Sequence, residues 1–274
     1  MTSPTGRIAF IGGGNMASAI IGGLVRQGLT PDRIAVVEPF AEARERLAQA
    51  YGVTAEAAVG PALQGAGVVV WAVKPQTFRE AAAQARPHLA GAIHLSVAAG
   101  IRSDSIAAWT GSERIVRAMP NTPALVGRGM TGLFAREAVS AVDRAQVESV
   151  LATTGRLLWV GEECHLDAVT ALSGSGPAYV FYFLEAMQQA GVEMGLSAEQ
   201  ARTLAVGTFD GASALAAASP DPLATLRERV TSKGGTTYAA LTSLEAAGVK
   251  ASFVTALHAA CRRADELGNE FGAS

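Results

Sequence analysis

Residues 230–241, VTSKGGTTYAAL, contain the clearest candidate for chemistry in the chain. Hydroxyl residues flank a Gly-Gly pair, and an apolar pattern with helical spacing begins directly after it. The first amides of such a helix are unpaired and lie at the positive end of its dipole, so they favour a carboxylate or a phosphate. The glycines let a ligand approach the backbone, while Ser232, Thr236 and Thr237 can form directional hydrogen bonds. An ordinary N-cap needs a single hydroxyl, so we interpret this segment as an anion-binding loop.

A second glycine-rich segment, GGGNMA at residues 12–17, lies near the N-terminus. It follows the short apolar run at residues 8–11 and opens a segment with helical spacing, which is the order of elements in a dinucleotide-binding fingerprint. In that G-x-G-x-x-A pattern, Gly12 allows the tight turn, Gly14 lets a pyrophosphate approach, and Ala17 permits close contact between helix and strand. The segment therefore predicts a nicotinamide cofactor, either NADPH or NADH.

Glu38 bears on the choice between these two cofactors. It ends a predicted strand at residues 34–38, where the acid of the fingerprint forms a hydrogen bond with the ribose 2′-OH. That role suits NADH and repels the 2′-phosphate of NADPH. A solvated acid at a strand end is an equally good interpretation, and Arg44 in the next helix could reach a phosphate. The sequence leaves the cofactor preference open.

Further apolar runs predict the rest of a doubly wound, mostly parallel sheet. They cover residues 68–73, 93–97, 114–119, 129–134 and 155–160. Ligands bind beyond the carboxyl ends of parallel strands. We therefore expect Lys74, the Ala98-Ala99 pair and the loop at residues 119–123 to border one crevice. Lys74 is a candidate cofactor ligand, although a solvated lysine fits the same position.

The second half of the chain changes to helical spacing after about residue 161. SGSGP at residues 173–177 is predicted to be a loop that leads into a helix ending near residue 194. Ser197 and Gln200 form a capping box for the next helix. Three more helices are expected, ending near residues 230, 245 and 267. The predicted fold is α/β, with a Rossmann-type domain at residues 1–161 and an all-helical substrate-binding and dimerisation domain at 162–274.

The composition excludes several classes of protein. A net charge of -2 argues against a nucleic-acid partner, which needs clustered lysines and arginines. The two cysteines and four histidines have no metal-ligand spacing, so we expect no metal site. No apolar run is long enough to cross a membrane, and the N-terminus does not resemble a signal peptide, so the sequence predicts a soluble, cytoplasmic protein.

A nicotinamide cofactor and an anion loop together imply hydride transfer involving a small carboxylate-bearing substrate. Hydroxyacid dehydrogenases need a positioned proton donor or acceptor beside the reacting carbon–oxygen bond. The predicted helix at residues 177–194 contains no Lys, Asn or His that could serve. A protonated imine needs less help, because its C=N bond already carries positive charge and attracts hydride. The sequence thus favours an imine as the substrate.

Several segments, in order along the whole chain, resemble the pyrroline-5-carboxylate reductase family. They are GGGNMA at residues 12–17, AVKPQ at 72–76, MPNTP at 119–123, SGSGPAY at 173–179 and VTSKGGTT at 230–237. The resemblance implies reduction of 1-pyrroline-5-carboxylate to proline with NADPH or NADH, the last step of proline biosynthesis. It also implies a homo-oligomer, in which the helical domain forms an interlocked dimer and dimers can assemble into rings.

The resemblance also implies roles for individual residues. Thr237, as the catalytic residue, would form a hydrogen bond with the ring nitrogen of the substrate, and the amides around the Gly-Gly pair would hold its carboxylate. Lys233 departs from the family pattern, in which proline is common at this position. The expected cofactor-binding residues are Ile11, Gly12, Gly13, Gly14, Asn15, Met16, Ala17, Glu38, Ala72, Val73, Lys74, Pro75, Ala98 and Ala99. The expected substrate-binding residues are Met119, Pro120, Asn121, Ser232, Gly234, Gly235, Thr236 and Thr237.

Two alternatives stay open at the level of sequence. The chain could reduce another small cyclic imine or a keto acid, because pocket size cannot be read from these patterns. It could also be a protein that senses NAD(P)H without turnover, since a fold alone does not establish catalysis. A sensor would need no anion loop in its helical part, and the segment at residues 230–237 therefore argues against that alternative.

Overall fold

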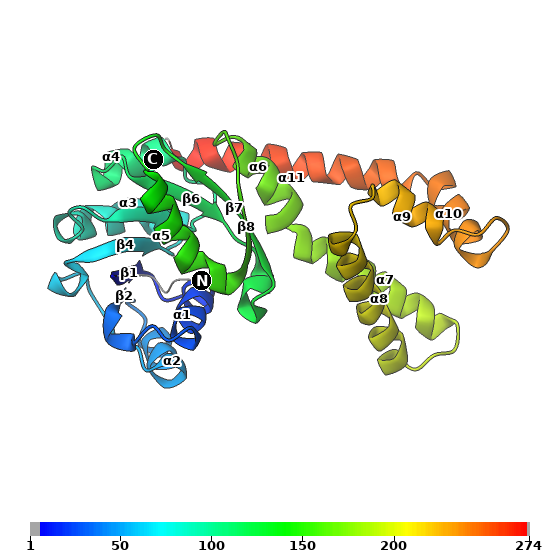
Figure 1. The fold of residues 1–274 in the computed structure, drawn as a ribbon, viewed down its shortest axis with the longest axis horizontal. Helices are drawn as coiled ribbons and strands as arrows, with labels where there is room; N and C mark the ends of the chain where they lie inside the picture. Colours follow the sequence, from blue (N-terminus) through cyan, green and yellow to red (C-terminus); the bar gives the residue numbers. More distant parts are fainter. Residues whose placement is uncertain (1–5, 273–274) are drawn as a thin grey trace. The chain divides into compact units, whose positions relative to one another are not determined.

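The computed structural model describes residues 6–272, and its central feature is an eight-stranded sheet. The strands follow the order β3-β2-β1-β4-β5-β6-β7-β8, and neighbours run parallel except β6 and β7. This is the predicted Rossmann-type sheet (Figure 1), although the short strand β3 was not predicted. The strands are β1 (Arg7–Ile11), β2 (Ile34–Val37), β3 (Ala55–Glu56), β4 (Ala66–Trp71), β5 (Ile93–Ser96), β6 (Ile115–Met119), β7 (Gly129–Ala135) and β8 (Gly155–Trp159).

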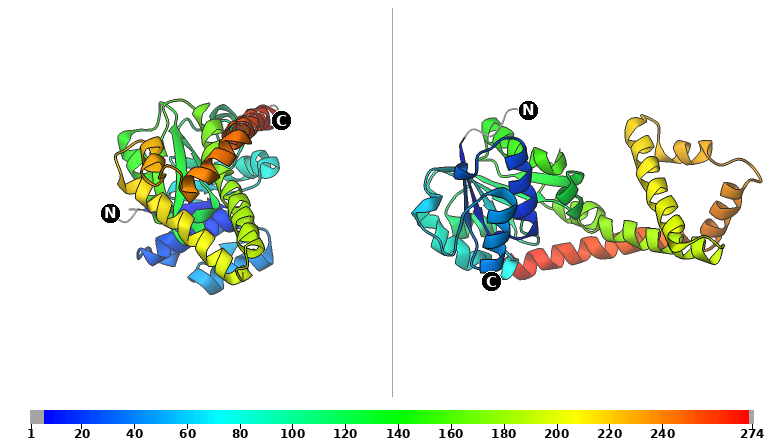
Figure 2. Two further views of the ribbon diagram at one scale, coloured as in Figure 1. Left: turned by 90° about the vertical axis from the view of Figure 1, so that its right-hand side faces the viewer. Right: turned by 90° about the horizontal axis from the view of Figure 1, so that it is seen from below.

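Helices cover both faces of the sheet, because successive residues of a strand point to opposite sides. In β1, Ile8 and Phe10 pack into one apolar cluster, whereas Ala9 and Ile11 belong to a second. Residues of α1, α2 and α5 complete the first cluster and residues of α3 and α4 the second, and Figure 2 shows the two helical layers. These helices are α1 (Asn15–Arg26), α2 (Ala41–Tyr51), α3 (Pro75–Ala85), α4 (Ser103–Thr110) and α5 (Ala141–Leu151).

Strand β7 reverses direction because its connection to β6 is too short for a crossover. Residues 120–128 contain only the short 3₁₀ segment η4 (Thr122–Val126). A parallel connection needs a dozen or more residues, usually with a helix. The MPNTP segment is therefore a tight corner at the carboxyl end of β6.

The segment predicted as a loop at residues 173–177 is helical instead. Helix α6 (His165–Val169) is followed by a π-helical stretch, η6 (Thr170–Gly174), and then by α7 (Gly176–Glu193). The amide of Ser175 donates to the carbonyl of Thr170 at 2.8 Å, which is the widened spacing of a π turn. Pro177 follows in the first turn of α7, as predicted, where its missing N–H costs nothing. The loop prediction was wrong because it rested on the local preference of serine and glycine. Contacts of Asn121 with Ser173 and of Met119 with Gly174 hold this segment in a helical conformation instead.

The remaining helices agree with the sequence patterns. They are α8 (Ala198–Ala218), α9 (Leu223–Arg229), α10 (Thr236–Ala246) and α11 (Val249–Gly272). The predicted capping box is present, because Ser197 Oγ accepts from the amide of Gln200 at 3.2 Å and the Gln200 side chain accepts from the amide of Ser197 at 2.9 Å. Helix α11 runs beyond the predicted end near residue 267. No helix in the described part of the chain has the length and apolarity that a membrane span requires.

Backbone contacts divide the chain into two compact units. The sheet unit extends to Ser175 and also includes the end of α11 from Ala260, while the helical unit is residues 176–259. The sequence instead placed the division after residue 161 and assigned the whole C-terminus to the helical domain. The boundary after residue 161, between a cofactor-binding and a substrate-binding domain, stays a prediction.

The end of α11 belongs to the sheet unit because it packs beside α4 (Figure 1). Arg102, which precedes α4, forms an ion pair with Asp265 at 2.5 Å. A Cβ at Gly268 would lie 3.0 Å from the Arg102 guanidinium, and a Cβ at Gly100 would lie 3.0 Å from the ring of Phe271. These close approaches make the last turns of α11 a part of the sheet unit's packing.

The helical unit leaves much of its apolar surface uncovered within one chain. The buried residues of α7 and α8 are small, and Gly191 packs closely against Ala201. Exposed large apolar side chains of this unit include Phe181, Tyr182, Met194, Leu204, Leu215, Leu223 and Val230. Large apolar side chains left exposed together are typical of surfaces that bind another protein, a membrane or a ligand.

His94 on β5 is a buried histidine with a structural role. Its Nδ1 accepts a hydrogen bond from the indole Nε1–H of Trp71 at 3.1 Å, and the two rings stack. Burial, with the nearby charge of Arg114, lowers the pKa of His94 from 6.5 to about 4. The folded protein therefore holds this imidazole in its neutral form.

The low pKa of His94 predicts acid sensitivity. Below pH 6.5 the unfolded chain takes up a proton that the folded chain refuses until about pH 4, so the free energy of unfolding falls across this window as pH falls. The full loss from this group is roughly 3 kcal/mol. Urea unfolding measured at several pH values checks it. His94→Gln, which keeps an acceptor for Trp71, should flatten this part of the pH profile, and an equally steep profile in that variant would contradict the assignment.

Candidate functional site

The turn between β1 and α1 is built around Gly12. Its φ of +98° is unfavourable for any residue with a side chain, and a Cβ there would lie 2.5 Å from the carbonyl oxygen of Ala72. The Gly12 amide donates to the carbonyl of Val37 at 2.8 Å, and the Ala72 amide donates to the carbonyl of Ile11 at 2.8 Å. The turn therefore lies at the carboxyl ends of β1, β2 and β4, where parallel sheets bind their ligands.

Gly14 is a glycine that the protein alone does not require. It precedes α1 in an extended conformation (φ −69°, ψ −170°), which any residue adopts, and a Cβ there would meet nothing within 4 Å. No side chain caps the first turn of α1. Free amides with open space before them fit a pyrophosphate that approaches the backbone closely. The loop thus has the shape that a dinucleotide needs.

Glu38 lies beneath this turn and is not the solvated acid that the sequence allowed. It is only 5% exposed. Its Oε2 accepts a hydrogen bond from the amide of Gly13 at 2.7 Å, and its Oε1 accepts one from the amide of Phe40 at 2.9 Å. Nearby, Nη1 of Arg44 donates to the carbonyls of Glu38 and Pro39. The carboxylate therefore joins the end of β2 to the glycine turn.

The structure brings the other predicted cofactor residues to the same edge of the sheet. The Val97 amide donates to the carbonyl of Trp71 at 3.0 Å, which aligns the ends of β4 and β5. Lys74 is exposed and precedes α3, and Ala98 is buried while Ala99 is exposed. Their contacts with a cofactor stay predictions. The residues gathered at this edge are Ile11, Gly12, Gly13, Gly14, Asn15, Met16, Ala17, Glu38, Ala72, Val73, Lys74, Pro75, Ala98 and Ala99.

The predicted substrate residue Asn121 has its side-chain amide occupied by the protein. Its Nδ2 donates to the backbone carbonyl of Ser173 at 3.1 Å, and its Oδ1 accepts from the amide of Met130 at 2.9 Å. Beside it, a Cβ at Gly174 would lie 2.5 Å from Cε of Met119. The corner after β6 is thus fastened to the π-helical stretch η6. A direct contact of residues 119–121 with substrate stays a prediction.

The predicted anion loop begins helix α10 in the helical unit. Gly235 is its N-cap residue, and no side chain caps the first turn. Gly234 has a φ of +75°, which explains a glycine there. Ser232, Thr236 and Thr237 are exposed, so their hydroxyls are accessible. The geometry leaves the first amides of α10 available for an anion.

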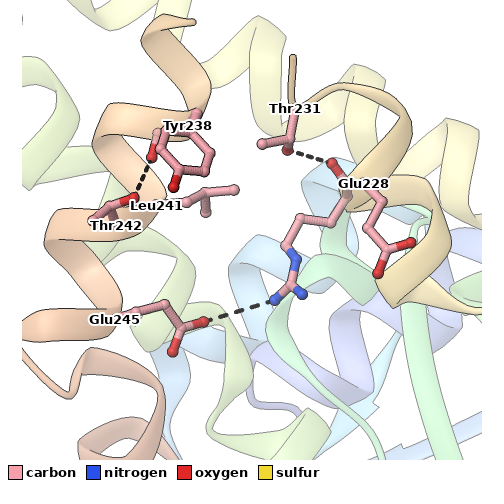
Figure 3. Close-up of a pocket in the computed structure, with 7 residues that line it drawn as sticks. Glu228, Thr231, Tyr238, Leu241, Thr242 and Glu245 are labelled. Carbon is pink, nitrogen blue, oxygen red and sulfur yellow. Dashed lines mark hydrogen bonds and ion pairs between the residues drawn. The ribbon is translucent and has the colours of Figure 1, made fainter. Parts of the chain in front are cut away.

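A hollow of about 350 Å³ lies between α9 and α10, next to this loop (Figure 3). Its two threonine hydroxyls are already bonded, since Thr231 Oγ1 donates to the carbonyl of Arg227 at 2.6 Å and Thr242 Oγ1 to that of Tyr238 at 2.8 Å. Arg227 also lies 3.8 Å from a carboxylate oxygen of Glu245. None of the predicted substrate residues lines this hollow, which is formed by Arg227, Glu228, Thr231, Tyr238, Leu241, Thr242 and Glu245.

Sequence patterns missed a polar network at the start of α6. Glu163 accepts from the side chain of buried Arg117 at 2.6 Å and from both the amide and the hydroxyl of Ser103 at 2.6 Å. The network holds the segment before α6, and with it the approach to η6, against the sheet. An arginine inside an otherwise apolar strand is the one signal that could have indicated it.

Two separate segments of the chain match known protein families. Residues 163–267 match the family described as pyrroline-5-carboxylate reductase dimerisation. Residues 7–100, which include the glycine turn and Glu38, match the family described as NADP oxidoreductase coenzyme F420-dependent.

Whole-chain relatives are similar over nearly their entire length. A pyrroline-5-carboxylate reductase of Pseudomonas aeruginosa is 44% identical over 98% of this chain and 99% of its own. One of Haemophilus influenzae is 44% identical over 95% of this chain and 97% of its own. The solved structure of a pyrroline-5-carboxylate reductase from Coxiella burnetii has a TM-score of 0.90 and 39% identity, covering 96% of this chain and 98% of its own. A Plasmodium falciparum pyrroline carboxylate reductase, solved with NADP bound, has a TM-score of 0.86 and 28% identity, covering 97% of this chain and 100% of its own.

The bonds of Asn121 predict that it stabilises the fold. Asn121→Ala removes both hydrogen bonds and leaves the partly buried amide of Met130 unpaired. This should lower the free energy of unfolding by about 1–3 kcal/mol. Chemical denaturation followed by circular dichroism measures the change in the free energy of unfolding. Asn269→Ala, at an exposed position of α11, is the control and should change stability little. Equal stability of the two variants would contradict the stabilising role of Asn121.

Proposed function

The chain belongs to the pyrroline-5-carboxylate reductase family, and we propose that it reduces the C=N bond of 1-pyrroline-5-carboxylate to give L-proline. This is the last step of proline biosynthesis, and NADPH or NADH supplies the hydride. The observation that carries the proposal is the presence of two uncapped helix N-termini with glycines before them, one in each unit. One suits the pyrophosphate of a dinucleotide and the other suits the carboxylate of a small substrate.

The cofactor is assigned to the carboxyl edge of the sheet. Gly12 and Gly14 shape the turn, and the first amides of α1 bind the pyrophosphate. When bound, the nicotinamide provides the hydride. Lys74, exposed at the start of α3, is available to a phosphate oxygen of the cofactor. Glu38 fixes the turn from below through the amide of Gly13.

The substrate is assigned to the loop before α10. The amides of Gly235 and Thr236, with the hydroxyl of Ser232, hold the carboxylate, and Gly234 gives the loop its left-handed turn. Thr237 forms a hydrogen bond with the ring nitrogen and so orients the C=N bond. When the imine arrives protonated, its carbon accepts the hydride and the nitrogen keeps its proton, so the reaction gives a neutral amine without a further acid.

Self-association through the helical unit follows from the dimerisation family matched by residues 163–267. The uncovered apolar side chains of α7 and α8 supply a surface of the expected kind. We further propose that dimers assemble into rings. A cytoplasmic location stays a prediction from the sequence.

A direct test follows the absorbance of NADPH or NADH with the purified protein and 1-pyrroline-5-carboxylate. We expect oxidation of the cofactor that depends on the substrate. Comparison with the six-membered cyclic imine checks the substrate, and a faster reaction with that compound would assign the chain to a different imine. Binding of cofactor without any turnover would instead indicate a sensor.

Thr237 is predicted to contribute to catalysis through its hydroxyl. A hydrogen bond to a charged group is worth about 1.5–3 kcal/mol, so Thr237→Ala should lower kcat/KM by about ten- to a hundredfold or more. Thr242→Ala is the matched control, because that hydroxyl lies in the same helix and is bonded to the carbonyl of Tyr238. Circular dichroism checks the fold of both variants. If both retain the full kcat/KM, Thr237 has no part in the mechanism.

A further inference from the structure

Glu38 combines burial with a fixed orientation at the cofactor edge. Its side chain is 5% exposed, and each carboxylate oxygen accepts one backbone hydrogen bond, from Gly13 and from Phe40. The side chain also packs against the glycine turn, because a Cβ at Gly13 would lie 3.2 Å from both Cβ and Cγ of Glu38. The carboxylate therefore cannot swing away from the turn without breaking these contacts.

The hydrogen-bonding capacity of this carboxylate is selective. An ionised carboxylate has about four acceptor sites and no donor, and the amides of Gly13 and Phe40 use two of them. The sites that remain can accept only from groups that donate, such as the 2′- and 3′-hydroxyls of a ribose. A 2′-phosphate carries acceptors and negative charge, and the repulsion is weakly screened at a desolvated acid.

The surrounding turn offers little compensation for a phosphate. Residues 38–40 supply one carboxylate, a proline and a phenylalanine that is 73% exposed. Arg44 is the basic side chain beside them, and its Nη1 donates to the carbonyls of Glu38 and Pro39 at 2.9 Å and 2.7 Å. Nη1 of that guanidinium is thus engaged in holding the turn.

We propose that this chain binds NADH in preference to NADPH and that Glu38 is the residue that discriminates between them. The same carboxylate positions the glycine turn, so cofactor choice and turn geometry depend on one side chain. The proposal deepens the proposed function but rests only on its cofactor site. The proposal concerns this chain and not the whole family, because the Plasmodium falciparum relative was solved with NADP bound.

The test measures dissociation constants for NADH and for NADPH by titration calorimetry, without substrate. For the wild type we expect NADH to bind at least about tenfold more tightly than NADPH, which corresponds to about 1.4 kcal/mol. Glu38→Gln removes the charge but keeps one acceptor oxygen, and it should reduce the preference about tenfold, mainly by tightening NADPH. Glu42→Gln is the matched control, because it removes an exposed charge of the same helix–turn region without touching Gly13, and it should preserve the wild-type ratio.

Tighter or equal binding of NADPH by the wild type would overturn the proposal, and so would an unchanged ratio in Glu38→Gln. If Glu38→Gln does not fold, the proposal is tested by the wild-type ratio of the two dissociation constants together with the variant Arg44→Ala. That variant should leave the ratio of the NADPH and NADH dissociation constants nearly unchanged, whereas a large loss of NADPH affinity without a loss of NADH affinity would assign Arg44 to the 2′-phosphate. Because binding is measured without turnover, a failure to reduce the imine would count against the proposed function and leave this result intact.

Discussion

The bond between the Glu38 carboxylate and the amide of Gly13 is the interaction on which the cofactor edge depends. It joins the end of β2 to the turn between β1 and α1, and both partners are shielded from water. A buried carboxylate is tolerated only where its oxygens are bonded, and the amides of Gly13 and Phe40 satisfy that condition. With the turn held from below, the first amides of α1 point at a fixed position. The same carboxylate therefore fixes both the end of β2 and the position of the turn that is proposed to bind the pyrophosphate.

Two polar side chains at the predicted sites, Glu38 and Asn121, hold the backbone. Glu38 is bonded to the glycine turn, and Asn121 is bonded to β7 and to the π-helical stretch. Groups that remain open toward ligands include the main-chain amides at the starts of α1 and α10, together with the exposed hydroxyls of Ser232, Thr236 and Thr237. Recognition by amides requires an accurate backbone more than a particular side chain. This explains why the most distinctive segments of the sequence are rich in glycine, proline and asparagine.

Much of this fold could be predicted from the sequence, because the determining signals are local. Continuous apolar runs predicted β4 and β5, and the glycine fingerprint predicted the turn before α1. The two-residue strand β3 was missed because two residues carry no periodic signal. The π-helical stretch was predicted as a loop, because its stability depends on distant contacts with Met119 and Asn121. The environment of Glu38 was left open for a similar reason, since burial is a property of the assembled sheet.

The sheet unit is discontinuous in the sequence, and this has a consequence for how the chain is made. Its strands are complete by residue 159, yet Asp265, Gly268 and Phe271, which cover Arg102 and Gly100, come from the last turns of α11. During synthesis from the N-terminus, the sheet can form early, but this side of it stays open until the last turns of α11 have been made. The two units are therefore not simply consecutive along the chain. The helical unit is an insertion, and an N-terminal fragment cut before it would be an unfinished domain rather than an isolated nucleotide-binding module.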